Sequence, residues 1–600
     1  MIILGISDSH EAHACIVQDG RLLAAIAEER LTRLKADMGY PERSIDKILK
    51  TVDISPQDID IVAVASVNGA PFQLLYKLNA LLSVRDYIKQ CEKYWKPVLL
   101  DKKLLTPLDD FNMFKHLRGE TLKDDPYYPF IERINGRNPK EYSAIFNNLR
   151  KEVITQHLEI SSDRIHFYRH EDCHKAYGYH SSPFNSEKFL VFTIEGGGDD
   201  SSASVSTIAN NNITEHWKSN NVHLGRLYRY VTLILGMLPS QHEYKVMGLA
   251  PYGTEYHGKR SLEVFRRIHT VIGNEILDNK AFPDLYYSIK DALEGARFDG
   301  IAWGLQTYIE EVLTEWIANN CKSHGINNVI ISGGVAQNIK SCKKIMELPE
   351  VDKFWCGPIS GDGSLAIGAA WLASTKFDHE TDIKGLQNVY LGTAYDEKAI
   401  DEAVNKYSLR SDYHCVENPG NDLVAQWIDQ GYVAARFSGA MEFGQRALGN
   451  RSILADPRIY KSVEHINNKI KYRDFWMPFT PSMHYEEAEK YLINPKKVYS
   501  PFMTMAFDLK SEYIDIIPAV IHPADKTIRP QILKRDDNST YYDLISAFKK
   551  RSGLGILLNT SFNLHGEPMV ESPEDAVSTF IRSDLDVLLF DNIAILRVKP

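Results

Sequence analysis

The sequence predicts a mixed α/β protein of two domains: an α/β domain built from two copies of a β-rich unit, followed by an α+β domain. Three observations support this prediction. The chain has 600 residues, which is more than one hydrophobic core can organise. A group of three short apolar strands opens the chain and returns in similar form after residue 187. From about residue 396 onward, strands and helices alternate irregularly.

The composition is typical of a globular protein and argues against several classes. Hydrophobic residues make up 44% and charged residues 25% of the chain, and no apolar run approaches the ~18–20 residues of a membrane span. The first residues, "MIILGISDSH", lack the basic start and long apolar centre of a signal peptide, so we expect a cytoplasmic protein. The seven cysteines form no CxxC pair, which favours reduced thiols. A net charge of −10 disfavours binding to nucleic acid.

The first copy of the β-rich unit contains the runs "MIILGISD", "HACIVQDG" and "RLLAAIAEER". Asp19-Gly20 predicts a tight hairpin between the second and third runs. The second copy contains "KFLVFTIEGGGDD", "SSASVSTIAN" and "NITEHWKSN". Duplicated halves of this kind are typical of the actin/sugar-kinase fold, which holds a nucleotide between its halves. Two unrelated α/β domains remain the alternative.

Two further segments define the domain organisation. Residues 70–150, rich in lysine, tyrosine and leucine, predict a helical insertion without a catalytic pattern. Near residue 395 a short linker and a new helix indicate a boundary, so we expect domains at 1–395 and 396–600.

A pair of histidines is the first candidate metal site. His170 and His174 lie in "RHEDCHKAYGYH", and positions i and i+4 share one face of a helix. Two ordinary histidines on one helix would show the same spacing. Asp362 precedes a helix of small residues in "PISGDGSLAIGAAWLA". Its carboxylate either caps that helix or joins the two imidazoles as the third ligand of a metal ion, on one face of the ion, with open positions left for a substrate.

Glycine turns are candidate phosphate sites. Gly333 and Gly334 end an apolar strand in "NNVIISGGVAQNIKSCKKI" and precede a helix, whose free N–H groups attract phosphate. Asn338 would add a contact to a ribose or phosphate. Gly196 and Gly197 form a second such turn, directly after a strand. Turns without a ligand are the alternative. Lys245, in "EYKVMGLAPYG", is either a phosphate contact or part of a surface loop.

Basic residues gather in the second domain. Arginine side chains in apolar and glycine-bearing loops suit bidentate recognition of phosphate or carboxylate, whereas structural ion pairs with Glu442, Asp456 and Asp474 are the alternative. The basic residues are Arg436, Arg446, Arg451, Arg458, Lys469, Lys471, Arg473, Lys526 and Arg529. Asn559 follows a buried strand in "LLNTSFNLHGEP", where polar loops commonly contact ligands or cap turns.

Five segments resemble motifs of the NodU/CmcH family of O-carbamoyltransferases: "MEFGQRALGNRSILADPR", "KVMGLAPYG", "SGGVAQN", "EERLTR" and "LLNTSFN". The resemblance covers nearly the whole chain and is weakest over residues 70–150. Two places differ from the family. The chain has His10-Glu11-Ala12-His13 where the family usually has His-Asp-Ala-Ser, and Glu195 stands where the family usually has an Asp-Gly turn.

The resemblance implies a TsaD-like N-terminal domain and a YrdC-like C-terminal domain. The C-terminal domain would make carbamoyl adenylate from carbamoyl phosphate and ATP, with Mg²⁺ accompanying the ATP. The family's anion-binding and polar residues there match Arg436, Arg446, Arg451, Lys469, Arg473, Arg529, Ser482 and Asn559. Arg446, Arg473 and Lys469 would act directly in catalysis.

The N-terminal domain would carry out the transfer. The family's metal, generally iron, matches His170, His174 and Asp362, so we expect Fe²⁺ or another divalent ion acting as Lewis acid. The adenylate would be held by Gly196, Gly197, Lys245, Gly333, Gly334 and Asn338. His10 matches the family's N-terminal histidine and would be the base for the acceptor hydroxyl, assisted by Asp8 or Glu11.

The leading interpretation is an ATP-dependent O-carbamoyltransferase that acts on a hydroxyl of a small-molecule natural product. Overall resemblance and the acidic charge favour a cationic acceptor of the saxitoxin or aminoglycoside kind. A tRNA- or protein-modifying carbamoyl enzyme and a nucleotide-binding chaperone-like protein are the alternatives. We expect no nucleic-acid or membrane partner, and a homodimer would suit a chain of this size.

Overall fold

The computed structural model of the chain describes residues 1–184, 187–378 and 382–597. It divides into two compact units: unit 1 comprises residues 1–337 and 348–387, and unit 2 comprises residues 338–347 and 388–600. The division falls after residue 387, earlier than the boundary near 395 that the sequence suggested. Helix α16 (Ile339–Glu347) groups with unit 2 because its lysines pair with acids of that unit, Lys343 with Asp508 and Lys340 with Asp525.

Unit 1 contains two five-stranded sheets with the same topology. The first has the order β3-β2-β1-β4-β5 and the second the order β8-β7-β6-β11-β12. In each sheet the first three strands form an antiparallel meander, and the first strand then pairs in parallel with the fourth, which pairs in parallel with the fifth. The predicted duplication is therefore confirmed strand by strand.

The strands of the first sheet are β1 (Ile2–Ser7), β2 (His13–Gln18), β3 (Arg21–Ala27), β4 (Ile61–Ala65) and β5 (Ile165–Tyr168). Those of the second are β6 (Phe189–Ile194), β7 (Ala203–Ala209), β8 (Asn212–Ser219), β11 (Asn328–Ser332) and β12 (Lys353–Cys356). The predicted hairpin between β2 and β3 is present, with positive φ at both Asp19 (48°) and Gly20 (75°), as a type I′ turn requires.

Burial along the strands follows their position in the sheet. Every residue of the central strand β6, "FLVFTI", is buried, which matches a continuous apolar run with both sheet faces covered. The edge strand β8, "NITEHWKS", is largely exposed and polar, which protects an unpaired edge from further strand pairing.

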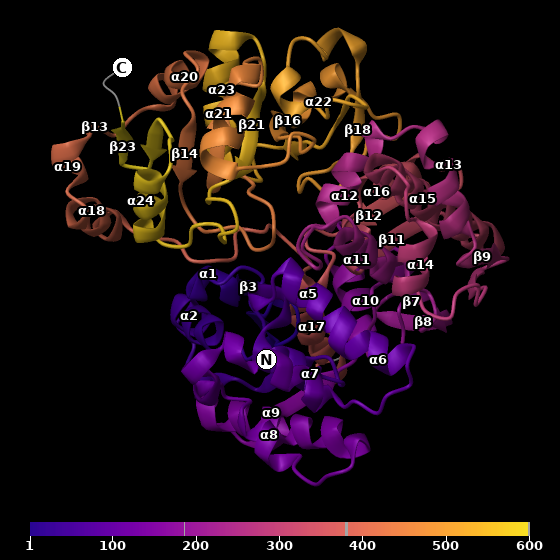
Figure 1. Cartoon of the computed structure of the whole chain (residues 1–600). Coiled ribbons are helices and arrows are strands. Elements are labelled where there is room, and N and C mark those ends of the chain that lie inside the picture. The colour runs from indigo at the N-terminus through magenta and orange to yellow at the C-terminus, as the bar shows by residue number, and fades with distance from the viewer. Residues whose placement is uncertain (185–186, 379–381, 598–600) are drawn as a thin grey trace. The chain divides into compact units, whose positions relative to one another are not determined.

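Two helices occupy equivalent places in the two copies. Helix α10 (His170–His180) follows β5, and α17 (Leu365–Phe377) follows β12 (Figure 1). They pack closely because Gly368 has no side chain: a Cβ atom there would overlap the carbonyl oxygen of Cys173 and lie 2.7 Å from its carbonyl carbon. A Cβ on Gly178 would lie 3.0 Å from Ile330 of β11, so α10 also lies tightly on the second sheet.

The predicted insertion is helical, as expected. It forms α3 (Pro71–Tyr76), α4 (Leu78–Leu81), α5 (Val84–Gln90), α6 (Lys96–Leu99), α7 (Pro107–Phe114), α8 (Pro129–Arg133) and α9 (Tyr142–Leu158). Its core is aromatic, with Phe72, Phe130 and Phe146 in edge-to-face contact at ring-centroid distances near 5.4 Å.

Unit 1 further contains α1 (Glu28–Thr32), α2 (Glu42–Val52), α11 (Leu224–Ile234), α12 (Glu243–Leu249), α13 (Glu255–Arg266), β9 (His269–Ile272), β10 (Glu275–Asp278), α14 (Tyr286–Ala292) and α15 (Phe298–His324).

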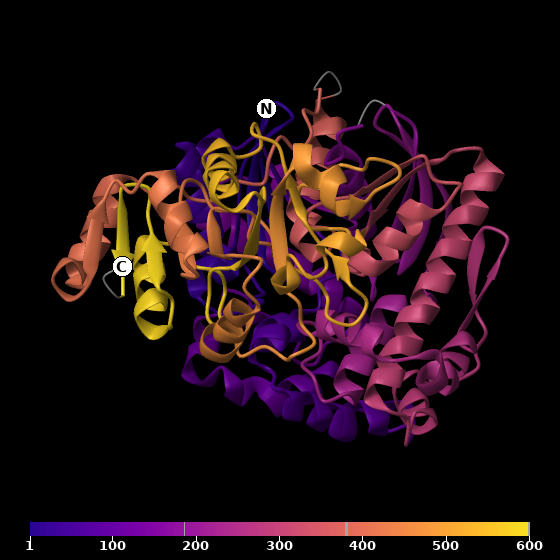
Figure 2. The ribbon, with the colours of Figure 1, turned by 90° about the horizontal axis from the view of Figure 1, so that it is seen from above.

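Unit 2 is a mixed sheet with helices, as the α+β prediction requires. Its eight strands have the order β13-β23-β22-β14-β15-β21-β16-β20 and are drawn in orange to yellow in Figures 1 and 2. They are β13 (His414–Glu417), β14 (Ala434–Phe437), β15 (Arg451–Ala455), β16 (Thr480–His484), β20 (Gln531–Leu533), β21 (Ile556–Ser561), β22 (Val587–Leu589) and β23 (Ile593–Leu596).

Helices α20 (Asn421–Asp429) and α23 (Ser539–Ser552) bury Trp427 and Phe548 in one apolar cluster with Leu454 and Leu557 of the sheet. The other elements of unit 2 are α18 (Glu397–Lys406), α19 (Leu409–Asp412), α21 (Tyr460–Ile466), α22 (Tyr485–Tyr491), β17 (Leu492–Ile493), β18 (Phe507–Leu509), β19 (Thr527–Ile528) and α24 (Pro573–Arg582). Within the described residues, no helix is both long and apolar enough to cross a bilayer.

Candidate functional site

Four side chains that can bind a metal meet in unit 1, where α10, the end of β6 and the turn before α17 come together. The candidate ligand atoms of His170, His174, Glu195 and Asp362 all lie within 4.8 Å of one another. Nε2 of His174 is 2.7 Å from Oε1 of Glu195 and 3.1 Å from Nε2 of His170. Nε2 of His170 is 3.6 Å from Oδ1 of Asp362. The structure thus brings the three predicted residues together and adds Glu195.

The chemistry of this donor set fits a divalent transition-metal ion. Two imidazole nitrogens and two carboxylates are ligands that suit such ions. Burial disfavours a charged imidazole, yet Glu195 and Asp362 together raise the pKa of His174 to about 9. Although burial acts in the opposite direction, His170 and His174 hold the pKa of Asp362 below its usual range. The carboxylates therefore create a negative potential that a cation would neutralise.

A neighbouring hydroxyl orients one of the imidazoles. Ser364 donates its O–H to the carbonyl of Gly361 at 2.9 Å, so its Oγ can accept a hydrogen bond from Nδ1–H of His174, 3.2 Å away. Nε2 of His174 then faces the other three candidate ligands. Such outer contacts commonly fix the tautomer of a metal-binding histidine.

Glu195 connects the donor cluster to the glycine turn after β11. Its Oε1 accepts a hydrogen bond from the N–H of Gly334 at 2.8 Å. Gly333 has φ 99°, and a Cβ there would lie 2.5 Å from the same oxygen. The two glycines are therefore needed for the close approach of the Glu195 carboxylate, a role that the sequence did not reveal. Their predicted contact with a nucleotide stays a prediction.

The N-terminus of α10 is fixed by Asp199, which the sequence analysis overlooked. Its Oδ2 accepts from the N–H of His170 at 2.8 Å and from that of Val67 at 2.8 Å. Its Oδ1 accepts from Asn68 N at 2.7 Å and from Ser66 Oγ at 2.8 Å. The acid after a glycine run, in "GGGDD", was the available signal. Asp199 holds the first turn of α10, which carries the two candidate histidine ligands, against the end of β4.

His10 lies in the turn after β1, within reach of the charges of the donor cluster. Burial lowers the pKa of its imidazole, the carboxylates of Asp362 and Glu195 raise it, and Arg229 and His170 lower it. The net effect is a lowered pKa, so the imidazole is neutral and able to accept a proton.

Asp8, considered as an assistant to His10, is engaged elsewhere. Its two oxygens accept from Nε and Nη2 of Arg150, both at 2.8 Å, and Oδ2 also accepts from the hydroxyl of Tyr127 at 2.6 Å. All three side chains are buried. Asp8 therefore joins the end of β1 to α9 and is a structural residue.

Three arginines of unit 2 form a positively charged site. Burial, and next the charges of Arg446 and Arg473, lower the pKa of the Arg529 guanidinium. Nε of Arg529 is buried and has no hydrogen-bond partner among the described residues. Nη2 of Arg473 donates to Thr560 at 3.2 Å. Like charges brought together in this way favour binding of an anion, so these three predicted residues make a candidate phosphate site.

Comparison with known proteins gives the family. Residues 2–371 match the family described as "Carbamoyltransferase N-terminus", and residues 425–597 match "Carbamoyltransferase C-terminus". The chain belongs to the carbamoyltransferase family. Among its relatives, an uncharacterized protein of Methanocaldococcus jannaschii is 32% identical over 100% of both chains. The nodulation protein NolNO of Sinorhizobium fredii is 30% identical over 97% of this chain and 78% of its own length.

The relatives also include the nodulation protein NolO of Bradyrhizobium diazoefficiens, 33% identical over 70% of this chain and 77% of its own. The protein is therefore a carbamoyltransferase of the NodU/CmcH type.

Likeness to solved structures is distant. Full-length HypF in its phosphate- and nucleotide-bound form has a TM-score of 0.31 and 12% identity, covering 63% of this chain and 47% of that chain. The ROK hexokinase from Thermus thermophilus has a TM-score of 0.28 and 10% identity, and the match covers 63% of this chain and 100% of that chain.

Two arginines of this carbamoyltransferase, predicted to contact the nucleotide, have structural partners. Arg451 is fully buried, donates to the carbonyls of Ser438, Gly439 and Asn450, and lies 3.6 Å over the ring of Phe437. Arg436 donates to the Gly449 carbonyl at 2.6 Å. Both side chains hold the loop between β14 and β15. Their predicted contact with a phosphate has no support in these contacts.

Ser482 and Asn559 form a buried polar network. Asn559 donates to Oγ of Ser482 at 2.9 Å, and Ser482 donates to Gln531 at 2.6 Å. Neither side chain is exposed. Their position between β16, β20 and β21 makes them supports of the sheet, and their contact with a ligand stays a prediction.

The two lysines of the segment 469–471 have different positions. Lys469, predicted to be catalytic, is 60% exposed and lies 3.8 Å from Asp584. Lys471 is buried, and its Nζ donates to the carbonyl of Asn563 at 2.9 Å and to the side chain of Asn563 at 2.6 Å. Lys471 therefore holds the polar loop after β21. The alternative of structural ion pairs is correct for Arg458, which binds Asp456.

The other residues that were predicted to hold the adenylate make contacts within the protein or are buried. Nε of Arg226, a cation that the sequence analysis missed, donates to the Gly196 carbonyl at 2.5 Å. A Cβ on Gly197 would lie 2.8 Å from Nη2 of the same arginine. Lys245 is buried in α12. Oδ1 of Asn338 accepts from Ser341 N at 3.0 Å, so Asn338 caps α16.

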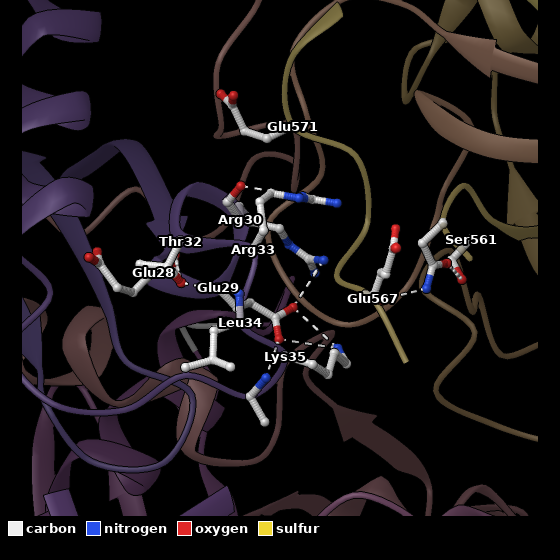
Figure 3. Close-up of polar contacts among 12 residues, drawn as sticks. Glu28, Glu29, Arg30, Thr32, Arg33, Leu34, Lys35, Ser561, Glu567 and Glu571 are labelled. Atoms are coloured by element: carbon white, nitrogen blue, oxygen red, sulfur yellow. Dashed lines mark hydrogen bonds and ion pairs between the residues drawn. The ribbon is translucent and has the colours of Figure 1, made fainter. Parts of the chain in front are cut away.

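The family-like segment "EERLTR" forms α1 and a compact ion cluster (Figure 3). The Glu29 carboxylate accepts from Ala36 N at 2.7 Å and from Lys35 Nζ at 3.2 Å, and pairs with Arg30 at 3.0 Å. Burial opposes its ionisation, yet Lys35 and Arg30 lower the pKa of Glu29 to about 2. Glu29 therefore stays charged and fixes the turn after α1.

Proposed function

We propose that this carbamoyltransferase uses ATP and carbamoyl phosphate to form carbamoyl adenylate and transfers the carbamoyl group to a hydroxyl of a small-molecule natural product. The observation that carries the proposal is the donor cluster of His170, His174, Glu195 and Asp362, whose charges act on His10. A Lewis-acid site with a neutral imidazole near it suits transfer to a weak nucleophile such as a hydroxyl.

Adenylate formation belongs, in this proposal, to unit 2 acting as a YrdC-like domain. Carbamoyl phosphate is hydrolysed to carbamate and phosphate. A carbamate oxygen then attacks the α-phosphorus of Mg²⁺-bound ATP, the bond to the β-phosphate breaks, and pyrophosphate leaves. Arg446, Arg473 and Arg529 neutralise the phosphate charge that shifts during this step. Arg451, whose Nη1 donates to the Ser438 carbonyl, supports the loop that carries Arg446.

Transfer belongs to unit 1 acting as a TsaD-like domain. His170, His174, Glu195 and Asp362 would hold Fe²⁺ or another divalent ion, which when bound supplies a Lewis acid beside the carbamoyl group. His10 takes the proton of the acceptor hydroxyl, whose oxygen bonds to the carbamoyl carbon, and AMP leaves. In this proposal the glycine turns at Gly196 and Gly333, with the guanidinium of Arg226, hold the adenylate phosphate.

The acceptor is proposed to be a hydroxylated natural product. The net charge of −10 favours a cationic one of the saxitoxin or aminoglycoside kind. Arg229, whose positive charge acts on His10, disfavours a cationic group next to the reacting hydroxyl. We therefore expect any cationic group of the acceptor to lie away from the hydroxyl that is carbamoylated.

The first experiment separates the two steps. Purified protein is incubated with ATP, and pyrophosphate release is measured with and without carbamoyl phosphate. Release that depends on carbamoyl phosphate supports adenylate formation, whereas a nucleotide-binding chaperone-like protein would show none. Arg446→Ala should abolish the release. His170→Ala should leave it largely intact and stop transfer to the acceptor.

A surface variant provides the control. Arg535 is 62% exposed and forms an ion pair with Asp543 on the surface, so Arg535→Ala should leave both steps unchanged. If His170→Ala removes pyrophosphate release as completely as Arg446→Ala, the assignment of the steps to the two units is wrong.

The second experiment addresses the acceptor. The protein is incubated with ATP, carbamoyl phosphate and a panel of hydroxylated aminoglycosides, guanidinium toxins and oligosaccharides, and mass spectrometry detects the gain of a carbamoyl group. A labelled tRNA and a peptide mixture are included in parallel. Carbamoylation of tRNA or peptide alone would favour the macromolecule-modifying alternative.

A further inference from the structure

One polar side chain of the helical insertion reaches the turn that carries His10. Asn79, in the short helix α4, is 3% exposed, and its side-chain amide contacts Nδ1 of His10. The surrounding side chains of the insertion, such as Leu78 and Leu82, belong to an apolar core. An amide in such surroundings is costly to bury unless its polar atoms are used.

The backbone around Asn79 is held on both sides. Its carbonyl oxygen accepts a hydrogen bond from the side chain of Gln241, in the loop between α11 and α12. The carbonyl of the preceding residue, Leu78, accepts from the hydroxyl of Tyr87 at 3.3 Å. Two separate elements therefore fix the position at which the Asn79 amide meets the imidazole.

The contact leaves the amide oxygen of Asn79 without a hydrogen bond. With the amide nitrogen facing His10, Oδ1 of Asn79 is buried and has no hydrogen-bond partner among the described residues. The oxygen and nitrogen of an amide occupy nearly the same space, so the side chain fits equally well when turned by 180°. The two orientations impose opposite tautomers on the histidine.

The orientation follows from the chemistry proposed for His10. Because Asn79 occupies Nδ1, only Nε2 remains to take a proton from a hydroxyl. A neutral imidazole that is basic at Nε2 carries its proton on Nδ1, and Nδ1–H needs an acceptor. The amide oxygen of Asn79 meets that need, whereas a donating amide nitrogen would leave the proton on Nε2 and make His10 unable to act as base.

We propose that Asn79 is a positioning residue for carbamoyl transfer: its amide oxygen accepts the Nδ1–H of His10 and so holds the imidazole in the tautomer that is basic at Nε2. The turned amide then directs its NH₂ group to the place of the unpartnered oxygen. This inference rests on the proposed function, because it assigns a role within the transfer step. It also gives the insertion a function, which is to supply the residue that orients the base.

The direct test reads the tautomer, independently of activity. Full-length protein with ¹⁵N-labelled histidine and diamagnetic Zn²⁺ is studied by NMR, and the His10 signals are assigned from their loss in His10→Gln. We expect a protonated Nδ1 and an unprotonated Nε2. A proton on Nε2 in the wild-type protein would overturn the proposal.

Two substitutions at Asn79 test the same relationship by kinetics. Asn79→Leu keeps the size but removes the acceptor, so the transfer rate should fall roughly 100-fold while pyrophosphate release stays unchanged. Asn79→Asp keeps an acceptor oxygen and should retain the Nδ1–H tautomer and more of the transfer activity than Asn79→Leu. Equal transfer rates in both variants, or wild-type transfer in Asn79→Leu, would contradict the proposal.

Failure of the broader function is distinguishable. If His10→Gln transfers the carbamoyl group at the wild-type rate, His10 is not the base and the proposed transfer step is wrong. The tautomer measured in the wild-type protein and in Asn79→Asp still decides whether Asn79 accepts from His10. If Asn79→Leu fails to fold, the His10 tautomers of the wild-type protein and of Asn79→Asp are sufficient to test the proposal.

Discussion

Gly368 lies against the backbone of Cys173, so that the first turns of α17 and α10 touch without any side chain between them. This contact sets the distance between Asp362, just before α17, and the two histidines of α10. The cluster therefore depends on a residue that binds nothing.

Gly368→Ala should separate the helices. The added methyl group overlaps the Cys173 carbonyl, and overpacking of this kind costs about 1–3 kcal/mol. We expect a lower Tm and weaker binding of a divalent ion, measured by competition with a chelator. Gly420→Ala is the matched control, because a Cβ there meets no atom within 4 Å. Equal Tm and ion affinity in both variants would mean that the close approach is not required.

Removal of the Glu195 charge should weaken metal binding. Glu195→Gln keeps the shape but removes one of two carboxylates from the donor cluster. We expect the dissociation constant for a divalent ion to rise at least about 10–100-fold. Removal of a residue that only hydrogen-bonds to a metal ligand already weakens metal binding by this amount. Elemental analysis and titration measure it. Asp200→Asn, at an acid that is 44% exposed, should bind metal normally. Unchanged affinity in Glu195→Gln would exclude Glu195 as a ligand.

His13 should make the stability depend on pH. Its Nδ1 donates to the Glu11 carbonyl at 2.7 Å, and its Nε2 accepts from Ala366 N at 3.2 Å, so the buried ring is neutral. Burial lowers the pKa of His13 to about 4, below the unfolded value of 6.5. Because the unfolded chain binds the proton first, stability falls as the pH drops from 6.5 towards 4.

The size of this effect follows from linkage. At pH 5 the wild-type protein should lose about 2 kcal/mol that His13→Gln does not lose, since other titrating groups are common to both. Urea unfolding at pH 7 and pH 5 measures the difference. If the unfolding free energies of the wild-type protein and His13→Gln fall by the same amount between pH 7 and pH 5, His13 has the same pKa in the folded and the unfolded chain, and the prediction is wrong.

Arg451 and Arg446 should respond differently to substitution. Arg451→Met leaves the carbonyls of the loop between β14 and β15 buried without donors, so we expect a loss of more than about 3 kcal/mol in unfolding free energy. Arg446→Met removes a like charge beside Arg529 and should abolish pyrophosphate release while lowering the Tm less than Arg451→Met does. Thermal unfolding and the pyrophosphate assay test both. A stable, inactive Arg451→Met would restore its predicted role as a phosphate ligand.

Much of unit 1 could be predicted because its signals are local. The Asp19-Gly20 hairpin, the repeated strands and the helical spacing of His170 and His174 are all encoded within a few residues. The partners of these elements are not local. Glu195 stood out in the sequence only as a departure from a family turn, since its contact with His174 requires β6 and α10 to meet.

The arginines of unit 2 show the same limit more clearly. Arg446 and Arg451 lie in one glycine-bearing segment, and their surroundings in the sequence are alike. The backbone carbonyls that occupy the guanidinium of Arg451 come together only when strands β14 and β15 fold side by side. The sequence could therefore indicate a cluster of arginines as a candidate anion site, but it could not show that Arg451 holds a loop.

The two matching sheets of unit 1 also divide the donors evenly between them. His170 and His174 belong to the first copy, and Glu195 and Asp362 belong to the second. Neither copy alone holds more than half of the donors, so the four-residue set forms only where both copies are folded and packed against each other. Ion binding should therefore report on the docking of the two halves of unit 1 and not on the folding of either half by itself.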